Sequence, residues 1–226
     1  MGKLIVIEGV DASGKQTQTE LLYKYMTSLN DKVIKIEFPD YESASSAPVK
    51  MYLNGDFGKD AGSVNPYAAS TFFAVDRFAS YKTKWERKYR DDYIIIADRY
   101  VTANMIYQAS KLADANDKQA FCEWVCDFEY KKLGLPVPDL KIFLDVKPEI
   151  SFELMAKRKN KFTGEEALDI HENDKEYLIK TYENARFIAD NYGFITVDCV
   201  RNGALRSIED IHNEICRTVK ENIYAD

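Results

Sequence analysis

The sequence predicts a three-layer α/β/α fold built on a five-stranded parallel sheet, and three observations lead to this class. Short apolar runs recur along the chain and helical patterns follow them, an alternation typical of a parallel sheet covered on both faces. A glycine-rich turn beginning at Gly9 connects the first run to the first helical pattern. With 226 residues and 46% hydrophobic content, the chain can bury one substantial core. We therefore expect a single domain over residues 1–226.

The predicted strands are the apolar runs themselves. They lie at about residues 4–7, 32–37, 93–98, 140–146 and 194–198. The predicted helices lie at about 15–29, 47–53, 66–90, from 102, 118–131, 148–157, 173–191 and 207–222. The helix near residue 66 has a clear start, because Asn65 suits the N-cap and Pro66 tolerates the first helical position. Sheets of this kind bind ligands at the carboxyl ends of their strands, so the functional residues should gather there.

Composition and charge argue against several classes of function. The formal net charge is −6, whereas proteins that bind long nucleic acids usually carry a basic excess or patch, so we expect no nucleic-acid polymer as partner. No run approaches the roughly 18 apolar residues of a membrane span. Met1 leads directly into an apolar strand without the features of a secretory leader, so we expect a cytoplasmic protein. Cys122 and Cys126 share a helix face and are expected to pack in the core rather than bind metal.

The glycine-rich turn nearly matches the phosphate-binding pattern G-x-x-x-x-G-K-[ST]. Its glycines permit a tight turn whose backbone N–H groups point at phosphate oxygens, and the helix that follows adds its positive N-terminal end. Lys15 is the residue that reaches the β- and γ-phosphates in such a loop. The pattern therefore predicts a P-loop fold that binds ATP through Gly9, Val10, Asp11, Ala12, Ser13, Gly14, Lys15, Gln16 and Thr17.

One position of this loop departs from the pattern, and it concerns Mg²⁺. Gln16 stands where Ser or Thr normally offers a hydroxyl to the metal, and Thr17 lies about 100° further around the helix. The hypothesis is that Mg²⁺ is held by ATP oxygens, water and a nearby carboxylate, or by the amide oxygen of Gln16. Asp98, at the end of the third predicted strand, is the candidate carboxylate and would act through water. The adjacent Arg99 can clasp a phosphate with two hydrogen bonds.

Five motifs in order resemble those of the thymidylate kinase family. After the phosphate loop come Phe38-Pro39-Asp40-Tyr41, Phe73-Ala74-Val75-Asp76-Arg77, Asp98-Arg99-Tyr100 with Tyr107-Gln108, and Leu135-Pro136-Val137-Pro138-Asp139-Leu140. The resemblance covers about residues 4–146. It implies a kinase that transfers the γ-phosphoryl group of ATP to dTMP, giving dTDP and ADP, a step in dTTP synthesis. It also implies that the chain forms a homodimer.

The resemblance assigns the recognition of thymine to three side chains. Phe73 would stack on the base, Arg77 would bind a thymine carbonyl, and Asn104 would hydrogen-bond the ring. The chemistry suits these roles, because a planar donor and an amide with both donor and acceptor match the edge of a base. Taken without the resemblance, the residues favour a core position for Phe73 and a surface charge for Arg77.

The resemblance also assigns residues to the phosphate and sugar of dTMP. Arg99 would hold the phosphate, Asp11 would lie close to it, and Tyr107 would crowd the sugar 2′ position. Many members of the family carry an Arg where this chain has Tyr41, so that contact would be a hydroxyl or absent. The expected substrate site is completed by Phe38, Tyr41 and Gln108.

The cations for the transfer step are expected on a mobile lid at about residues 157–168. Some thymidylate kinases carry an Arg inside the phosphate loop, where this chain has Ala12. The run Lys157-Arg158-Lys159-Asn160-Lys161 supplies four cations where the family places its lid. Arg158 is the preferred transition-state cation, because guanidinium can clasp two phosphate oxygens, and it joins Asp11, Lys15 and Arg99 as a catalytic residue. A solvated charge run at a helix end is the alternative interpretation of the same residues.

Two other functions are compatible with parts of this pattern. A deoxynucleoside kinase, or a kinase for another deoxynucleoside monophosphate, also combines a P-loop with an Arg after a similar strand. A deoxynucleoside kinase would need a carboxylate base, for which Glu8, Glu37 and Asp98 are the candidates. A non-catalytic nucleotide-binding switch is the alternative from a different class. The sequence lacks an N-K-x-D segment, and an acceptor site would be superfluous in a switch.

Overall fold

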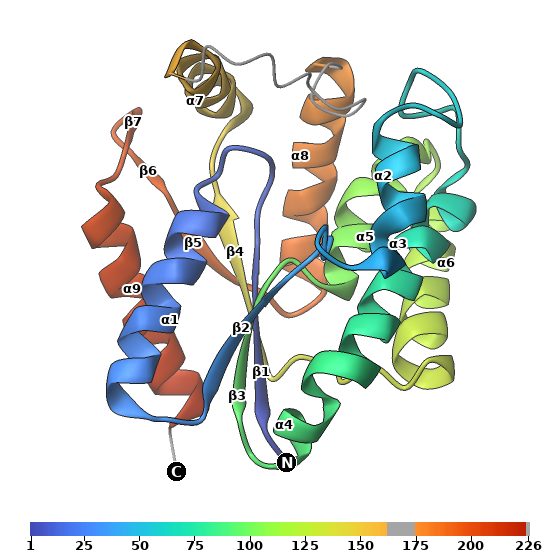
Figure 1. Cartoon of the computed structure of the whole chain (residues 1–226). Helices are drawn as coiled ribbons and strands as arrows, with labels where there is room; N and C mark the ends of the chain where they lie inside the picture. The colour runs from blue at the N-terminus through green and yellow to red at the C-terminus, as the bar shows by residue number, and fades with distance from the viewer. Residues whose placement is uncertain (162–174, 225–226) are drawn as a thin grey trace.

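Five strands form one parallel sheet at the centre of the structure (Figure 1). The computed structural model describes residues 1–161 and 175–224, the side chains of 156–161 excepted. The order across the sheet is β2-β3-β1-β4-β5. The strands are β1 (Lys3–Glu8), β2 (Val33–Glu37), β3 (Ile94–Asp98), β4 (Leu140–Asp145) and β5 (Ile195–Asp198). The predicted sheet is therefore confirmed, with strand bounds that differ from the prediction by no more than one residue.

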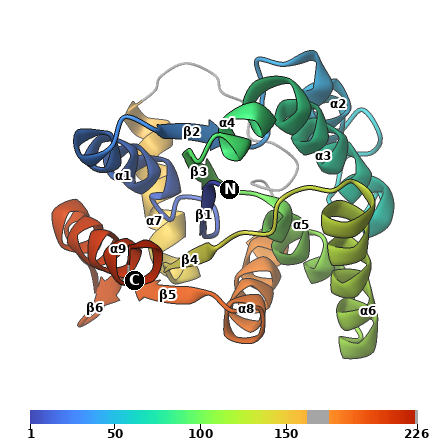
Figure 2. The same cartoon turned by 90° about the horizontal axis from the view of Figure 1, so that it is seen from below.

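Helices cover both faces of the sheet, as predicted (Figures 1 and 2). On one face lie α1 (Lys15–Leu29) and α9 (Ile208–Ile223). The other face is covered by α3 (Pro66–Ser80), α5 (Val101–Tyr107), α6 (Ala115–Cys126) and α8 (Lys175–Asn191). Successive residues of a strand point to opposite faces, so Ile5 and Ile7 pack under α1 and α9 while Leu4 and Val6 pack toward α5.

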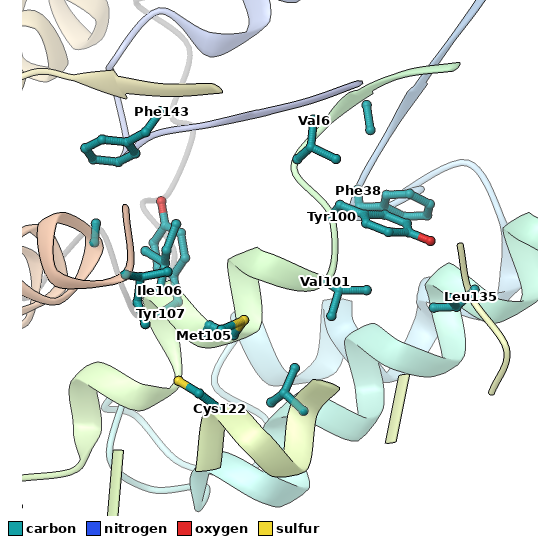
Figure 3. Packing of buried hydrophobic residues seen from close by; sticks show 14 of the residues in the cluster. Val6, Phe38, Tyr100, Val101, Met105, Ile106, Tyr107, Cys122, Leu135 and Phe143 are labelled. Atoms are coloured by element: carbon teal, nitrogen blue, oxygen red, sulfur yellow. The ribbon is translucent and has the colours of Figure 1, made fainter. Parts of the chain in front are cut away.

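Figure 3 shows buried residues of the core that packs around α5. Val101, Met105 and Ile106 of this helix are fully buried against β-strand residues such as Val6 and Phe143. Tyr107 and Phe38 belong to the same cluster and also line the cavity described below. Packing of the core thus fixes one wall of the functional site.

The remaining elements surround the carboxyl edge of the sheet or connect the larger helices. Near this edge lie α2 (Ala47–Leu53), α7 (Pro148–Lys161) and a hairpin of β6 (Val200–Arg201) with β7 (Ala204–Leu205). At the opposite end lies α4 (Glu86–Arg90). Two 3₁₀ turns, η1 (Ala44–Ser46) and η3 (Ala109–Lys111), and two π-helical segments, η2 (Tyr81–Trp85) and η4 (Asp127–Lys132), complete the chain.

Several predicted helices have different limits in the structure. The helix expected at 66–90 begins at Pro66, with Asn65 accepting from the N–H of Ala68 at 2.9 Å, but η2 divides it. The helix expected at 118–131 begins at Ala115 and passes into η4. The helix expected to end at Lys157 continues to Lys161, so the first residues of the expected lid are helical. The β6–β7 hairpin was not predicted.

The described residues include no helix that is both long enough and apolar enough to span a bilayer. All four cysteines are free, and Cys122 is fully buried beside the partly buried Cys126, in agreement with packing in the core.

Candidate active site

A cavity of about 810 Å³ opens at the carboxyl ends of β1, β2 and β3. It is lined by residues 11–17 of the phosphate loop and, around them, by residues from six other segments of the chain. The predicted site residues that it brings together outside the loop are Phe38, Tyr41, Phe73, Arg77, Asp98, Arg99, Asn104, Tyr107 and Gln108. Two predicted phosphate-loop residues, Gly9 and Val10, are not part of the lining.

Gly9 and Val10 do not line the cavity, but they shape the phosphate loop. A Cβ on Gly9 would lie 2.5 Å from Oγ of Ser13 and 3.0 Å from the carbonyl oxygen of Leu144, so only glycine fits. Gly14 adopts φ 82°, the left-handed conformation that glycine reaches without steric cost, directly before α1. Nζ of Lys15 donates to the carbonyl oxygen of Val10 at 2.8 Å, which folds this side chain back over the loop.

Lys15 occupies an unusual electrostatic environment. Burial, followed by repulsion from Arg99, lowers its pKa to about 8, although Asp11, Asp98 and Glu8 act in the opposite direction. The ammonium group is therefore held in a place that disfavours its charge until an anion arrives. The phosphates of a nucleotide would supply that anion, because an opposite charge nearby favours the charged form.

Asp11 connects the phosphate loop to the segment that follows β3. Its Oδ1 accepts from Nη2 of Arg99 at 2.5 Å and from the hydroxyl of Tyr107 at 3.3 Å. The guanidinium carbon of Arg99 lies 4.9 Å from the centre of the Tyr107 ring. Burial raises the pKa of Tyr107 well above its usual value, so this phenol remains a neutral donor. Three residues predicted from two separate motifs thus form one cluster.

Glu8, at the end of β1, also connects the phosphate loop to the segment that follows β3. Its carboxylate is fully buried, and Oε1 accepts from the backbone N–H of Tyr100 at 3.0 Å and from Oγ1 of Thr102 at 2.7 Å. Burial raises the pKa of Glu8. Glu8 does not line the cavity, so among the candidate bases for a deoxynucleoside kinase only Glu37 and Asp98 reach it.

The predicted base end of the cavity contains a buried ion pair that the sequence did not predict. Arg77 is only 1% exposed, so its interpretation as a surface charge is wrong. Its Nε and Nη2 donate to Oε2 and Oε1 of Glu129, each at 2.6 Å. Burial alone would lower the pKa of Arg77, but the Glu129 carboxylate outweighs it and raises that pKa. Asn104 joins the pair, since its Nδ2 donates to Oε1 of Glu129 at 2.9 Å.

The other predicted acceptor residues lie around this pair. Phe73 is partly buried, borders the cavity and meets Tyr52 edge-on with ring centres 6.2 Å apart. Phe38 is buried, whereas Tyr41 is 47% exposed at the rim. Gln108 is buried, and among the described residues its Oε1 has no hydrogen-bond partner.

The cavity extends further than the motifs indicate, toward the β7–α9 junction. Leu205, Arg206 and Ile208 line this part beside the start of α1. Asn202 and Gly203, with φ 54° and 77°, form the turn between β6 and β7. An Asn-Gly pair between two short apolar segments is a known hairpin signal and could have revealed this wall.

The predicted lid is only partly described. The backbone of residues 157–161 belongs to α7, while the side chain of Arg158 and residues 162–168 lie outside the described part of the chain. Leu154, one turn earlier on α7, does line the cavity.

The fold and site together define a class. A parallel sheet with a P-loop after β1, and a second set of polar side chains in the same cavity, is the arrangement of a P-loop nucleotide kinase. Comparison with known proteins narrows this class. A sequence model of the family described as thymidylate kinase matches residues 7–215, and the chain belongs to that family.

Individual relatives agree with this assignment. The chain is 35% identical over 179 residues to thymidylate kinase of Mycobacterium tuberculosis, covering 79% of this chain and 81% of that protein. It is 31% identical over 216 residues to thymidylate kinase of Schizosaccharomyces pombe, covering 95% and 90%. The solved structure of thymidylate kinase from Candida albicans matches with a TM-score of 0.70 at 21% identity, covering 98% of this chain and 92% of that one, which supports the fold. The resemblance found in the sequence is confirmed.

The lowered pKa of Lys15 predicts that ATP binding is coupled to proton uptake. Near pH 8, ATP binding should take up protons, because the phosphates raise a pKa that is about 8 in the free protein. ATP affinity should fall as the pH rises through that value, since more lysine must then be protonated on binding. Calorimetry in two buffers of different ionisation enthalpy measures the uptake. Lys15→Met should abolish it and the exposed Lys24→Met should not; equal proton uptake in Lys15→Met would contradict this assignment.

Proposed function

We propose that this chain transfers the γ-phosphoryl group of ATP to dTMP, producing dTDP and ADP. The observation that carries the proposal is that one cavity joins a phosphate-binding loop to a buried donor and amide pair, Arg77 and Asn104, suited to a base. Membership of the thymidylate kinase family agrees with this assignment. The part of the cavity at the β7–α9 junction would receive the nucleoside of ATP.

The residues would divide the reaction between them. The phosphate loop and Lys15 would bind the phosphates of ATP, and Arg99 would hold the phosphate of dTMP with Asp11 beside it. The attacking group is already an anionic phosphate oxygen, so positioning and charge stabilisation suffice without a general base. Phe73 would stack on thymine, Phe38, Tyr41 and Gln108 would bound the substrate, and Tyr107 would lie against the sugar.

The residues present also fit Mg²⁺. Mg²⁺ usually keeps several waters and binds one or two carboxylates together with substrate phosphates. The described residues hold no group of three or more His, Cys, Asp or Glu side chains that could bind a metal by themselves. Asp98 borders the cavity and would hold the ion through water, with Gln16 as the alternative oxygen ligand. When bound, Mg²⁺ would neutralise charge on the phosphate oxygens.

The remaining parts of the proposal concern organisation. We infer a single domain over 1–226 whose segment 157–168 acts as a lid and brings Arg158 to the moving phosphoryl group. A homodimer is supported by the outer side of α3, where Val75 and Phe78 are 52% and 37% exposed on one helical face. A cytoplasmic location is consistent with four free cysteines.

A coupled assay tests the main proposal. ADP formation should depend on both ATP and dTMP, and chromatography should identify dTDP as the second product. Thymidine, dUMP and the other deoxynucleoside monophosphates complete the panel. Phosphorylation of thymidine instead of dTMP would favour a deoxynucleoside kinase, and tight nucleotide binding without turnover of any monophosphate would favour a switch.

Arg158→Ala tests the lid. If Arg158 stabilises the transition state, its removal should lower kcat by about 10²-fold or more while dTMP binding changes little. Arg87→Ala, on the exposed surface of α4, is the matched control and should retain full activity. A kcat within about threefold of the unmodified protein would assign the catalytic charge to another lid cation, such as Lys161.

A further inference from the structure

Glu129 is the one acidic residue of the base end whose side chain contacts both Arg77 and Asn104 among the described residues. It is 0% exposed, and it lies 52 residues from Arg77 and 25 from Asn104 in the sequence. Its position is the π-helical segment η4, where α6 departs from regular geometry. Wide turns of this kind occur often at functional sites, because they redirect a side chain that a regular helix would place elsewhere.

The contacts of Asn104 determine which atom it can offer to a ligand. Nδ2 donates to Oε1 of Glu129 at 2.9 Å and to the carbonyl oxygen of Ser70 at 3.2 Å. Both partners only accept, so the opposite orientation of the amide would place its oxygen against two other oxygens. The two amide hydrogens are therefore engaged, and the atom that Asn104 can present to the cavity is the acceptor Oδ1.

The contacts of Arg77 determine the hydrogen-bond donor that lies beside this acceptor. Two of the five N–H groups of a guanidinium are given to Glu129, and every remaining group is a donor, since arginine has no acceptor. The bidentate geometry also holds the plane of the guanidinium in one orientation. The wall that these side chains form thus offers a donor from Arg77 beside an acceptor from Asn104.

We propose that Glu129 is a positioning residue that sets this hydrogen-bond polarity and thereby selects the pyrimidine. Thymine and uracil carry a carbonyl oxygen next to an N–H and match the donor and the acceptor. Cytosine carries an amino group next to an unprotonated ring nitrogen and mismatches both. A site built to hydrogen-bond its substrate rejects a mismatched analogue strongly, because buried polar groups are left unpaired. The inference rests on the proposed function, since it assumes that the base of the acceptor binds here.

Glu129→Gln is the decisive variant. Oε1 of Glu129 accepts from both Arg77 and Asn104, so in either orientation a glutamine sets its NH₂ against an N–H donor of Arg77. The two-point hold on the guanidinium is then lost, and the donor beside Asn104 is no longer fixed in place. The ratio of kcat/KM for dTMP to that for dCMP should therefore fall by about tenfold or more, while the ratio for dTMP to dUMP should stay within about twofold. Ratios do not depend on the fraction of folded enzyme. Glu123→Gln, on the exposed side of α6, is the matched control and should change neither ratio.

The outcomes separate this inference from the proposed function. A parallel loss with all three nucleotides would show that Glu129 is merely structural and would overturn the inference. If the unmodified protein turns over no dTMP, the proposed function fails, and dissociation constants for dTMP, dUMP and dCMP measured by calorimetry replace kcat/KM in the same ratios. Equal affinity of the unmodified protein for dTMP and dCMP would overturn the inference directly.

Two further measurements test the inference if Glu129→Gln does not fold. Glu129→Asp retains the charge but is one methylene too short to reach both partners, so it should also narrow discrimination against dCMP. If neither variant folds, a crystal structure of the unmodified protein with dTMP decides. Oδ1 of Asn104 on N3 of thymine, with Nδ2 still on Glu129, supports the inference, and a rotated Asn104 or a released Arg77 overturns it.

Discussion

The site depends on the hydrogen bonds that Glu8 makes at the end of β1. Its buried carboxylate accepts hydrogen bonds from the backbone N–H of Tyr100 and the hydroxyl of Thr102. These bonds join the start of the phosphate loop to the segment after β3. Arg99, between β3 and Tyr100, has φ 63°, a conformation that costs a non-glycine residue roughly 1–2 kcal/mol. The contacts on either side of it hold that conformation, which directs the guanidinium to Asp11. The phosphate loop and the segment after β3, which form the two halves of the cavity, are therefore held together by the same group of contacts.

The phosphate end and the base end of the cavity differ in how charge is arranged before a ligand binds. At the phosphate end, a loop of small residues exposes backbone N–H groups, and the charge of Lys15 is disfavoured until an anion binds. At the base end, a charged pair is buried before any ligand arrives. Burying such a pair is costly and contributes little net stability, but removal of one partner typically costs about 3–5 kcal/mol. We therefore attribute the Arg77–Glu129 pair to specificity, because a simple apolar contact would hold the helices together equally well.

The sequence predicted the parts of the structure that rest on local patterns. The apolar runs gave the strands, Asn65 gave the start of α3, and the glycine pattern gave the phosphate loop. Glu129 escaped prediction because its partner lies 52 residues away and because a π-helical segment changes the face on which it emerges. Strands of two residues are too short to show alternation, so only the Asn202-Gly203 turn could have indicated the β6–β7 hairpin.

Ion pairs engage most of the cations that line the cavity. Four cations line it within the described residues: Lys15, Arg77, Arg99 and Arg206. Arg77 is paired with Glu129, Arg99 with Asp11, and Arg206 with Asp210 and Glu214. Lys15 alone among these four forms no ion pair within the described residues. Under the proposed function, Mg²⁺ and cations beyond the described lining would balance the remaining charge of the phosphates, because Ala12 adds no charge to the loop. The basic run of residues 157–161 follows Leu154 on the same helix, which supports the proposed lid as the source of those cations.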